Sequence, residues 1–168
     1  MSRSHFMRQE EVFIELLQQH ERIINKVCRV YAQDAEDRND LYQEIALQAW
    51  RSYPNFRGDA QFSTWLYRVA LNTAITQFRK SKKAATTPEL LEPFVAPAAE
   101  TDTEEEQLQS MYRAIAKLSE LDKAIVLLYL DDYPYDDIGR VMGITPNHVA
   151  VKMSRIKTKL QSLTQQST

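Results

Sequence analysis

The chain has 168 residues, of which 43% are hydrophobic and 26% charged, and its formal net charge is −2. Three glycines are too few for Gly-rich phosphate loops or many tight β-turns, so the composition favours a compact, helix-rich protein. With so small a net charge, nucleic-acid binding cannot be argued from the total and requires an uneven distribution of charge along the chain.

The single cysteine, Cys28, excludes an intramolecular disulfide. It shares a helical stripe with Ile24 and Tyr31, which predicts a buried small hydrophobic residue rather than a redox thiol. The longest apolar run, residues 124–130, is far shorter than the about 20 residues that span a bilayer, and the N-terminus has no apolar signal segment. We therefore expect a cytoplasmic protein without membrane insertion.

The first half of the chain shows apolar residues at helical spacing. Residues 10–32 predict one long amphipathic helix and residues 34–39 a polar turn. Asp40 is expected to cap a second helix, which Pro54 ends.

A polar loop with a Gly-Asp turn, residues 55–61, separates the second helix from a third. Ser63 or Thr64 is expected to cap this third helix, which runs to about Ser81.

The charge changes sign twice along the chain. Residues 60–88 contain five basic residues and no acidic one, residues 84–107 seven acidic and no basic ones, and residues 138–168 five basic and no acidic ones. Prolines and the lack of an apolar period predict that the acidic segment is a flexible linker. We expect an all-α protein in which this linker, residues 84–107, joins two small helical domains, residues 1–83 and 108–168.

The second domain ends in a predicted helix-turn-helix, residues 135–160. Gly143 supplies the corner, and Thr145 followed by Pro146 is typical of a helix start. The stripes expected to be buried are Ile138, Val141 and Met142 in the first helix and Val149, Met153, Ile156 and Leu160 in the second. The basic residues Arg140, Lys152, Arg155, Lys157 and Lys159 lie elsewhere on the two helices. Such a face attracts phosphate, as the second helix of this motif does when it enters the major groove of DNA.

Small and polar residues on the second helix suit contacts with bases. Asn147 and His148 can donate to phosphates or base edges, while Ala150, Val151 and Ser154 let the backbone approach the groove. The alternative is an ordinary corner of a helical bundle, but such a helix would mix charges of both signs four residues apart.

Aromatic and basic residues are mixed around the 55–61 loop and the third helix. They are Phe56, Arg57, Gly58, Asp59, Phe62, Trp65, Tyr67, Arg68, Asn72, Phe78, Arg79 and Lys80. Aromatic rings among basic groups suit unstacked bases, each of which gains about 1 to 3 kcal/mol by stacking. For Trp65 and Leu66 a place in the helix core is the preferred interpretation, whereas the polar loop favours a function.

No arrangement of residues indicates catalysis. The histidines are scattered, and neither a metal-binding spacing of Cys or His nor a phosphate-loop or nucleophile motif occurs. The acid pairs 131–132 and 136–137 flank Pro134 and are interpreted as helix caps rather than a cation site. We expect no enzymatic activity, no cofactor and no metal.

Two segments resemble the extracytoplasmic-function (ECF) sigma factors of bacterial RNA polymerase. They are DLYQEIALQAWRSYPNFRGDAQFSTWLYRVALNTA and LSELDKAIVLLYLDDYPYDDIGRVMGITPNHVAVKMSRIKTKL. Within them D-L-x-Q-E, F-R-G-D, T-W-L-Y-R-x-A-x-N and the Y-x-D-I-G helix-turn-helix occur in the order and at the spacing of that family. The resemblance implies a factor that directs core RNA polymerase to promoter DNA and helps to open the −10 region.

The resemblance also implies three sets of site residues. Asp40, Gln43 and Glu44, on a helix face that alone is typical of a solvated surface, would meet the clamp of the largest catalytic polymerase subunit. The melted −10 element would be held by Arg57, Gly58, Asp59, Ala60, Gln61, Phe62 and Asn72, with Arg68, Arg79 and Lys80 on its backbone. The −35 element would be read by Thr145, Ala150, Val151, Ser154 and Arg155, with Asn147, His148 and Lys152 nearer phosphate.

The remaining implications concern the partners. The second domain would also bind the β flap, and the acidic linker would thread the polymerase channel where RNA later passes. Many family members have Gly-Thr-Val followed by Lys or Arg where this chain has residues 147–150, so the base preference at −35 is not transferred. Because no extension follows Thr168, regulation is expected to come from a separate anti-sigma factor.

Two other classes of protein compete with this interpretation. A conventional helix-turn-helix activator, whose first domain dimerises or senses a ligand, leaves the F-R-G-D loop and the acidic segment without a role. A helical adaptor without a DNA role leaves the uneven charge distribution unexplained.

Overall fold

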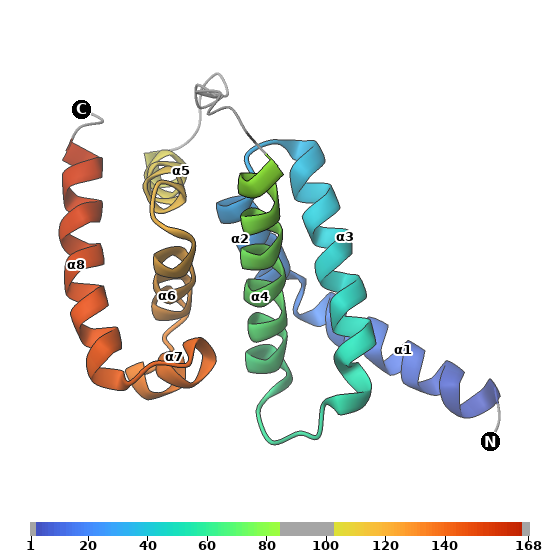
Figure 1. The fold of residues 1–168 in the computed structure, drawn as a ribbon. Helices are drawn as coiled ribbons and strands as arrows, with labels where there is room; N and C mark the ends of the chain where they lie inside the picture. Colours follow the sequence, from blue (N-terminus) through green and yellow to red (C-terminus); the bar gives the residue numbers. More distant parts are fainter. Residues whose placement is uncertain (1–2, 85–102, 166–168) are drawn as a thin grey trace. The chain divides into compact units, whose positions relative to one another are not determined.

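The computed structural model describes residues 3–84 and 103–165, which belong to two compact units divided after Ala84. Unit 1 contains α1 (Arg3–Gln19), α2 (Glu21–Tyr31), α3 (Ala35–Ser52), the 3₁₀-helix η1 (Tyr53–Asn55) and α4 (Phe62–Ala84). Unit 2 contains α5 (Thr103–Ala116), α6 (Glu120–Leu130), α7 (Tyr135–Met142) and α8 (Pro146–Gln165). Helices are the only regular elements in these residues, which confirms the all-α class (Figure 1).

Most of the expected linker, residues 84–107, lies outside the described residues. Its last part belongs to a helix, because α5 already begins at Thr103. Glu104, Glu105 and Glu106 form the first turn of α5, where the positive end of the helix dipole favours acidic groups.

Unit 1 is built around three helices, α2, α3 and α4, that run alongside one another (Figure 1). Its fully covered side chains include Ile24, Val27, Ile45, Leu66, Tyr67, Ala70 and Leu71. They come from all three helices at the spacing of one apolar stripe per helix, so each helix needs the other two to cover its stripe. Leu66 is a core residue, as preferred from the sequence, while Trp65 is half-buried.

The prediction of one helix over residues 10–32 is wrong, because the chain breaks at His20 into α1 and α2. The His20 backbone has φ −113° and ψ 16°, outside the helical range. Its ring Nδ1 donates to the Leu16 carbonyl over 2.8 Å, so the side chain satisfies a carbonyl at the end of α1. The apolar period continues across the break, which is why periodicity alone did not reveal it.

The predicted start of the second helix is also wrong. Asp34, not Asp40, caps α3, and its carboxylate accepts the backbone N–H of Asp37 over 2.7 Å. The residues expected to form a polar turn are the first turn of α3, where acidic side chains are favourable. The prediction that Pro54 ends the regular helix holds to within two residues, since α3 ends at Ser52 and Pro54 lies in η1.

The third predicted helix, α4, begins at Phe62 and therefore contains both residues expected to cap it. Its first turn is closed by the Gln61 carbonyl, which accepts the N–H of Trp65 over 3.1 Å. The helix continues to Ala84, three residues beyond the expected end.

Unit 2 packs α8 along α5 and α6, with α7 forming the connection at one end (Figure 1). The buried residues of this unit include Ile115, Ile125, Leu127, Leu128, Ile138, Val149, Met153 and Ile156. Ser119 caps α6 by accepting the N–H of Asp122 over 3.3 Å. The interpretation of residues 136–137 as side-chain caps is wrong, since Pro134 occupies the cap position of α7 without a side-chain bond.

The corner between α7 and α8 is the predicted helix-turn-helix turn. Gly143 has φ +72°, a left-handed conformation that disfavours any residue with a Cβ. Gly139 allows a close approach, because an added Cβ would lie 2.5 Å from the Ile144 carbonyl oxygen. Thr145 Oγ1 then accepts the backbone N–H of His148 over 3.1 Å, which confirms the predicted cap before Pro146.

Candidate nucleic-acid and polymerase interfaces

The outward face of α8 consists of the residues expected to face DNA. Val149, Met153 and Ile156 turn inward with at most 2% exposure, while Leu160 is half-buried. The exposed residues are Thr145, Asn147, His148, Ala150, Val151, Ser154 and Arg155. The buried stripe thus fixes the helix about its axis and leaves small, polar and cationic side chains on the outside.

Lys152 is the exception among the predicted DNA-facing residues. Its Nζ lies 3.6 Å from Asp122 Oδ1 on α6, and only about a quarter of either side chain is exposed (27% and 26%). Lys157 also contacts its own protein, with Nζ 5.0 Å from the centre of the Tyr129 ring. Both lysines therefore contribute to the packing of α8 against α6, a role that was not predicted from the sequence.

In unit 1, the loop between η1 and α4 is open to solvent. Arg57, Gly58, Asp59, Ala60 and Gln61 are all exposed, and Gly58 has φ +79°. The turn thus uses the one residue type that adopts this conformation without strain.

Phe62 departs from the expected −10 site because it is only 8% exposed. Its ring lies 5.8 Å from that of Phe56 and 5.4 Å from that of Trp65, measured between centres. Phe62 was grouped with the exposed loop residues in the prediction, whereas its ring packs against those of Phe56 and Trp65.

The outer face of α4 continues from the loop. Arg68, Asn72 and Arg79 are exposed and are spaced at i, i+4 and i+11, so they lie on one side of the helix. Lys80 is exposed as well, one position further round. This gives a cationic line with one amide that starts next to the loop.

A polar face on α3 contains the three residues predicted to contact polymerase. Asp40 and Gln43 are exposed, and the half-buried Glu44 accepts a hydrogen bond from Gln48 Nε2 over 2.9 Å. Leu47 continues the same face one turn later and is 41% exposed. Leu47 was not among the residues predicted from the sequence, although it follows Asp40 by seven residues, or two helical turns.

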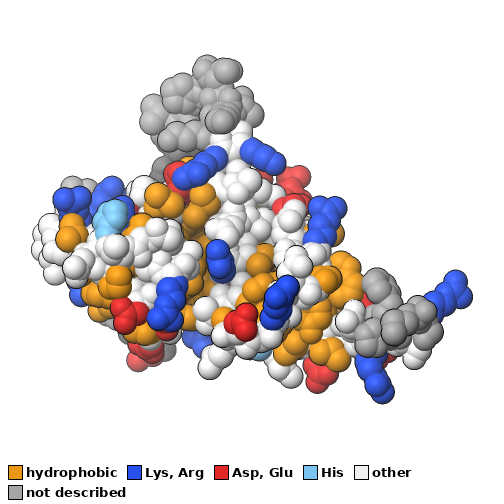
Figure 2. Space-filling model, turned by 60° about the horizontal axis from the view of Figure 1, so that its bottom comes forward, with side chains coloured by type: hydrophobic (Ala, Val, Ile, Leu, Met, Phe, Trp, Pro, Cys, Tyr) orange, Lys and Arg blue, Asp and Glu red, His pale blue; other side chains and the backbone are white. Residues whose placement is uncertain are grey.

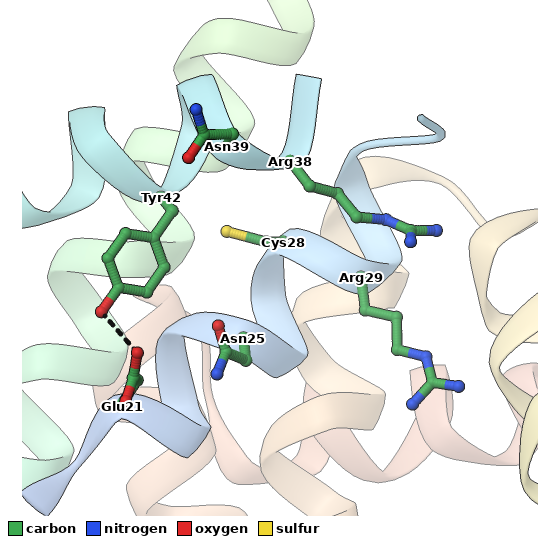
Figure 3. A pocket seen from close by; sticks show the side chains of 7 residues that line it. All are labelled: Glu21, Asn25, Cys28, Arg29, Arg38, Asn39 and Tyr42. Atoms are coloured by element: carbon green, nitrogen blue, oxygen red, sulfur yellow. Dashed lines mark hydrogen bonds between the residues drawn. The ribbon is translucent and has the colours of Figure 1, made fainter. Parts of the chain in front are cut away.

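An open pocket of about 480 Å³ lies between α2 and α3 (Figure 3). In this pocket the Tyr42 hydroxyl donates to Glu21 Oε1 over 3.0 Å. Burial, and to a smaller extent this hydrogen bond, raise the pKa of Tyr42 to about 12. Burial also raises the pKa of Cys28 to about 11, an effect that the Arg38 charge partly offsets. The thiol is therefore a poor nucleophile near neutral pH, and its 4% exposure confirms the prediction of a buried small residue.

Among residues 3–84 and 103–165, no three His, Cys, Asp or Glu side chains are grouped so that they would hold a metal ion. In the same part of the chain, no helix has the length and apolar character required to cross a membrane.

Comparisons with known proteins match both units. The sequence pattern of Sigma-70 region 2 matches residues 16–84, and that of Sigma-70 region 4 matches residues 108–160. The chain is 29% identical over 161 residues to the ECF RNA polymerase sigma factor SigM of Mycobacterium tuberculosis, covering 95% of this chain and 81% of SigM. It is 31% identical over 139 residues to the ECF RNA polymerase sigma-E factor of Escherichia coli K12, covering 75% of this chain and 73% of that factor.

Solved structures share the fold. The sigma factor RpoE from Bartonella quintana, in complex with the anti-sigma factor NepR, has a TM-score of 0.73 at 22% identity and covers 91% of this chain and 96% of its own. CnrH, in complex with the cytosolic domain of CnrY, has a TM-score of 0.67 at 19% identity and covers 95% of this chain and 91% of its own. With both family patterns in chain order on two helical units, the chain belongs to the ECF sigma factors, which act in transcription initiation by bacterial RNA polymerase.

Proposed function

We propose that unit 2 reads the −35 promoter element with the outward face of α8. The observation that carries this proposal is the separation of the two faces of α8. Its apolar stripe is buried, while Ala150, Ser154 and Arg155 are exposed on a helix that follows a helix-turn-helix corner. Small residues permit close approach of the backbone to the groove, and an arginine can bond a guanine edge in bidentate fashion.

The half-buried Lys152 has a different role in this proposal. Because it pairs with Asp122, it orients α8 on α6 and is a weaker phosphate ligand than Arg155. Asn147 and His148 lie at the exposed start of α8, where their side-chain donors suit phosphate.

Unit 1 captures the melted −10 strand in the second part of the proposal. Residues 57–61 form the exposed loop, and Asn72 lies on the α4 face that leads away from it. Arg68, Arg79 and Lys80 supply the positive charge that a displaced strand needs along its backbone. Phe62 holds the end of the loop through its ring contact with Phe56 and does not stack on a base in this proposal, because it is buried.

The polymerase clamp is proposed to bind the α3 face that contains Asp40, Gln43, Glu44 and Leu47. This face combines acidic and amide groups with one exposed leucine, a mixture that suits a partner helix with basic and apolar side chains. We also propose that unit 2 binds the β flap and that the acidic segment enters the RNA channel. Regulation by an anti-sigma factor is proposed as well, and it is supported by the solved complex of RpoE with the anti-sigma factor NepR. The proposed place of action is the cytoplasm, and no catalytic step is assigned to this chain.

Reconstituted transcription tests the assignment of the two promoter elements. Purified chain and core polymerase are assayed on a duplex promoter and on the same promoter with a pre-melted −10 region. Asn72→Ala should reduce initiation on the duplex more than on the pre-melted template, with Asn25→Ala on the exposed surface of α2 as the matched control. Equal losses on both templates would contradict the −10 pocket.

The −35 assignment has its own readout. Arg155→Ala should weaken recognition of the upstream element by roughly 1 to 3 kcal/mol, the size of one base contact. Arg113→Ala on the exposed surface of α5 is the control. If Arg155→Ala leaves the ranking of −35 sequence variants unchanged, Arg155 does not read bases.

A conventional activator remains the alternative function, and one measurement separates it from the proposal. An activator would protect promoter DNA from cleavage without polymerase and would need another sigma factor to start RNA. A sigma factor should bind the duplex weakly alone and give specific initiation once it is joined to core polymerase.

A further inference from the structure

Seven rings form a connected cluster that includes Phe56 and Phe62, the residues on either side of the 57–61 loop. They are Phe13 on α1, His20 between α1 and α2, Trp50 on α3, Tyr53 and Phe56 next to or within η1, and Phe62 and Trp65 on α4. We call this set the ring cluster. Neighbouring rings in the cluster have centres 5.1 to 6.5 Å apart, within the range of favourable aromatic pairs.

The two ends of the loop are fixed by the cluster. Phe56 precedes the loop and Phe62 follows it, and their rings meet edge to face at 5.8 Å and 89°. Both rings also lie near Tyr53, with centres 6.2 Å and 6.5 Å from its ring. The loop between them is exposed, so its position depends on the rings of Tyr53, Phe56 and Phe62, which we call the anchors, rather than on packing of its own residues.

Phe13 connects α1 to these anchors. It is 4% exposed, and its ring centre is 5.1 Å from the rings of both Trp50 and Tyr53. Its neighbours Val12 and Ile14 are each 44% exposed. Of these three neighbours, Phe13 is therefore the one whose side chain is inserted into the unit. In Figure 1, α1 passes the end of α3.

The end of α1 makes a second contact with the anchors. The His20 ring lies 5.1 Å from that of Phe62, while its Nδ1 donates to the Leu16 carbonyl. One ring near the middle of α1 thus reaches Tyr53, and the residue after α1 reaches Phe62. Both contacts are therefore made to anchor rings: Phe62 follows the loop directly, and Tyr53 contacts Phe56, which precedes it.

We propose that Phe13 is a positioning residue for capture of the −10 strand, acting through Tyr53 on the loop. The inference rests on the proposed function of the loop. It adds α1 to the strand-capture machinery, although Phe13 lies before residue 16, where the match to Sigma-70 region 2 begins. With Phe13 in place, Tyr53 has one position against Phe56 and Phe62, and the loop is held ready for the strand. Without it, the anchors gain freedom that must be lost again on binding.

The test separates the ring of Phe13 from general stability. Phe13→Leu keeps an apolar side chain of similar volume without the aromatic contacts, Phe13→Ala removes both, and Phe13→Tyr restores a ring. Ile14→Ala is the matched control, because Ile14 is an exposed neighbour on the same helix. Each variant is assayed with core polymerase on the duplex and the pre-melted promoter, and its thermal midpoint is measured alone.

We expect Phe13→Leu to reduce initiation about tenfold on the duplex promoter, which corresponds to the energy of about one ring pair. The reduction on the pre-melted template should be far smaller. Phe13→Tyr should recover most of this loss, and Ile14→Ala should behave as the unsubstituted chain. Trp50 and Trp65 are the two tryptophans of the sequence, and both belong to the cluster, so acrylamide quenching of tryptophan fluorescence reports on it directly. Phe13→Leu should increase quenching, and it should lose as much initiation on the duplex as Phe13→Ala does although its thermal midpoint falls less.

The inference is overturned if Phe13→Leu initiates as the unsubstituted chain does, or loses activity equally on both templates. A fall that simply follows the thermal midpoint across the three Phe13 variants would overturn it as well. Failure of the unsubstituted chain to initiate with core polymerase would instead refute the proposed function, on which the inference rests. The two failures are therefore distinguishable in one experiment.

Discussion

The ion pair of Lys152 offers a quantitative test of how unit 2 meets DNA. Lys152 Nζ lies 3.6 Å from Asp122 Oδ1, and both side chains are mostly covered. Arg155, one turn further along α8, is exposed. A lysine held by its own protein displaces no counterion from a phosphate, whereas an exposed arginine can. We predict that Asp122→Asn releases Lys152 toward the DNA.

The expected magnitude follows from counterion release. Each neutralised phosphate of duplex DNA contributes about 0.9 to the slope of log K against log salt concentration. Asp122→Asn should therefore steepen the slope by up to about 0.9, and Arg155→Ala should flatten it by about the same amount. Lys152→Ala should leave it nearly unchanged. Titration of a labelled promoter duplex with holoenzyme at several salt concentrations gives these slopes.

A charge-matched control removes the trivial explanation. Glu105→Gln deletes the same charge from the exposed first turn of α5 and should leave the slope unchanged. The reasoning is refuted if Lys152→Ala flattens the slope as much as Arg155→Ala does while Asp122→Asn has no effect. Lys152 would then already contact phosphate, and the ion pair with Asp122 would not persist on DNA.

Three further predictions concern the stability of the corner in unit 2 and the burial of the thiol in unit 1. Gly139→Ala should lower the free energy of unfolding in urea by about 1 to 3 kcal/mol, because its Cβ would lie 2.5 Å from a main-chain oxygen that no side-chain rotation relieves. Gly143→Ala has open space around it and should lose only about 1 to 2 kcal/mol, from its left-handed backbone; a much larger loss than at Gly139 would contradict this. Since burial raises the pKa of Cys28 to about 11, iodoacetamide at about pH 8 should modify it slowly until urea unfolds the chain, and equal rates would count against its burial.

Features set by local chemistry were predictable from the sequence. The stripe of Val149, Met153 and Ile156 is buried as expected, because a helical period fixes which residues share a face. Gly143 forms the corner and Thr145 caps α8, because a left-handed turn and an unpaired N–H each favour a few residue types. The fold class follows from several such local signals.

Features set by contacts between distant residues were not predictable. Lys152 pairs with Asp122 on another helix, and a charge count along the chain cannot distinguish a paired lysine from one that awaits phosphate. Phe62 belongs to the loop by sequence but to the ring cluster by packing. The break at His20 was missed because the apolar period on either side of it stays in phase with the core of unit 1.

The placement of charge explains why such a chain would recognise promoters only together with polymerase. Few of the basic side chains proposed to meet DNA are exposed on either unit: Arg68, Arg79 and Lys80 on α4, and Arg155 on α8. Figure 2 shows Lys and Arg side chains among neutral, apolar and acidic ones rather than on one continuous basic surface. A few such contacts give only weak, strongly salt-dependent binding at physiological ionic strength. Two weak sites gain affinity over either alone when both can be engaged at once, and this requires that their spacing match that of the DNA elements. We infer that polymerase supplies that spacing by holding the α3 face, so promoter specificity belongs to the holoenzyme rather than to either unit.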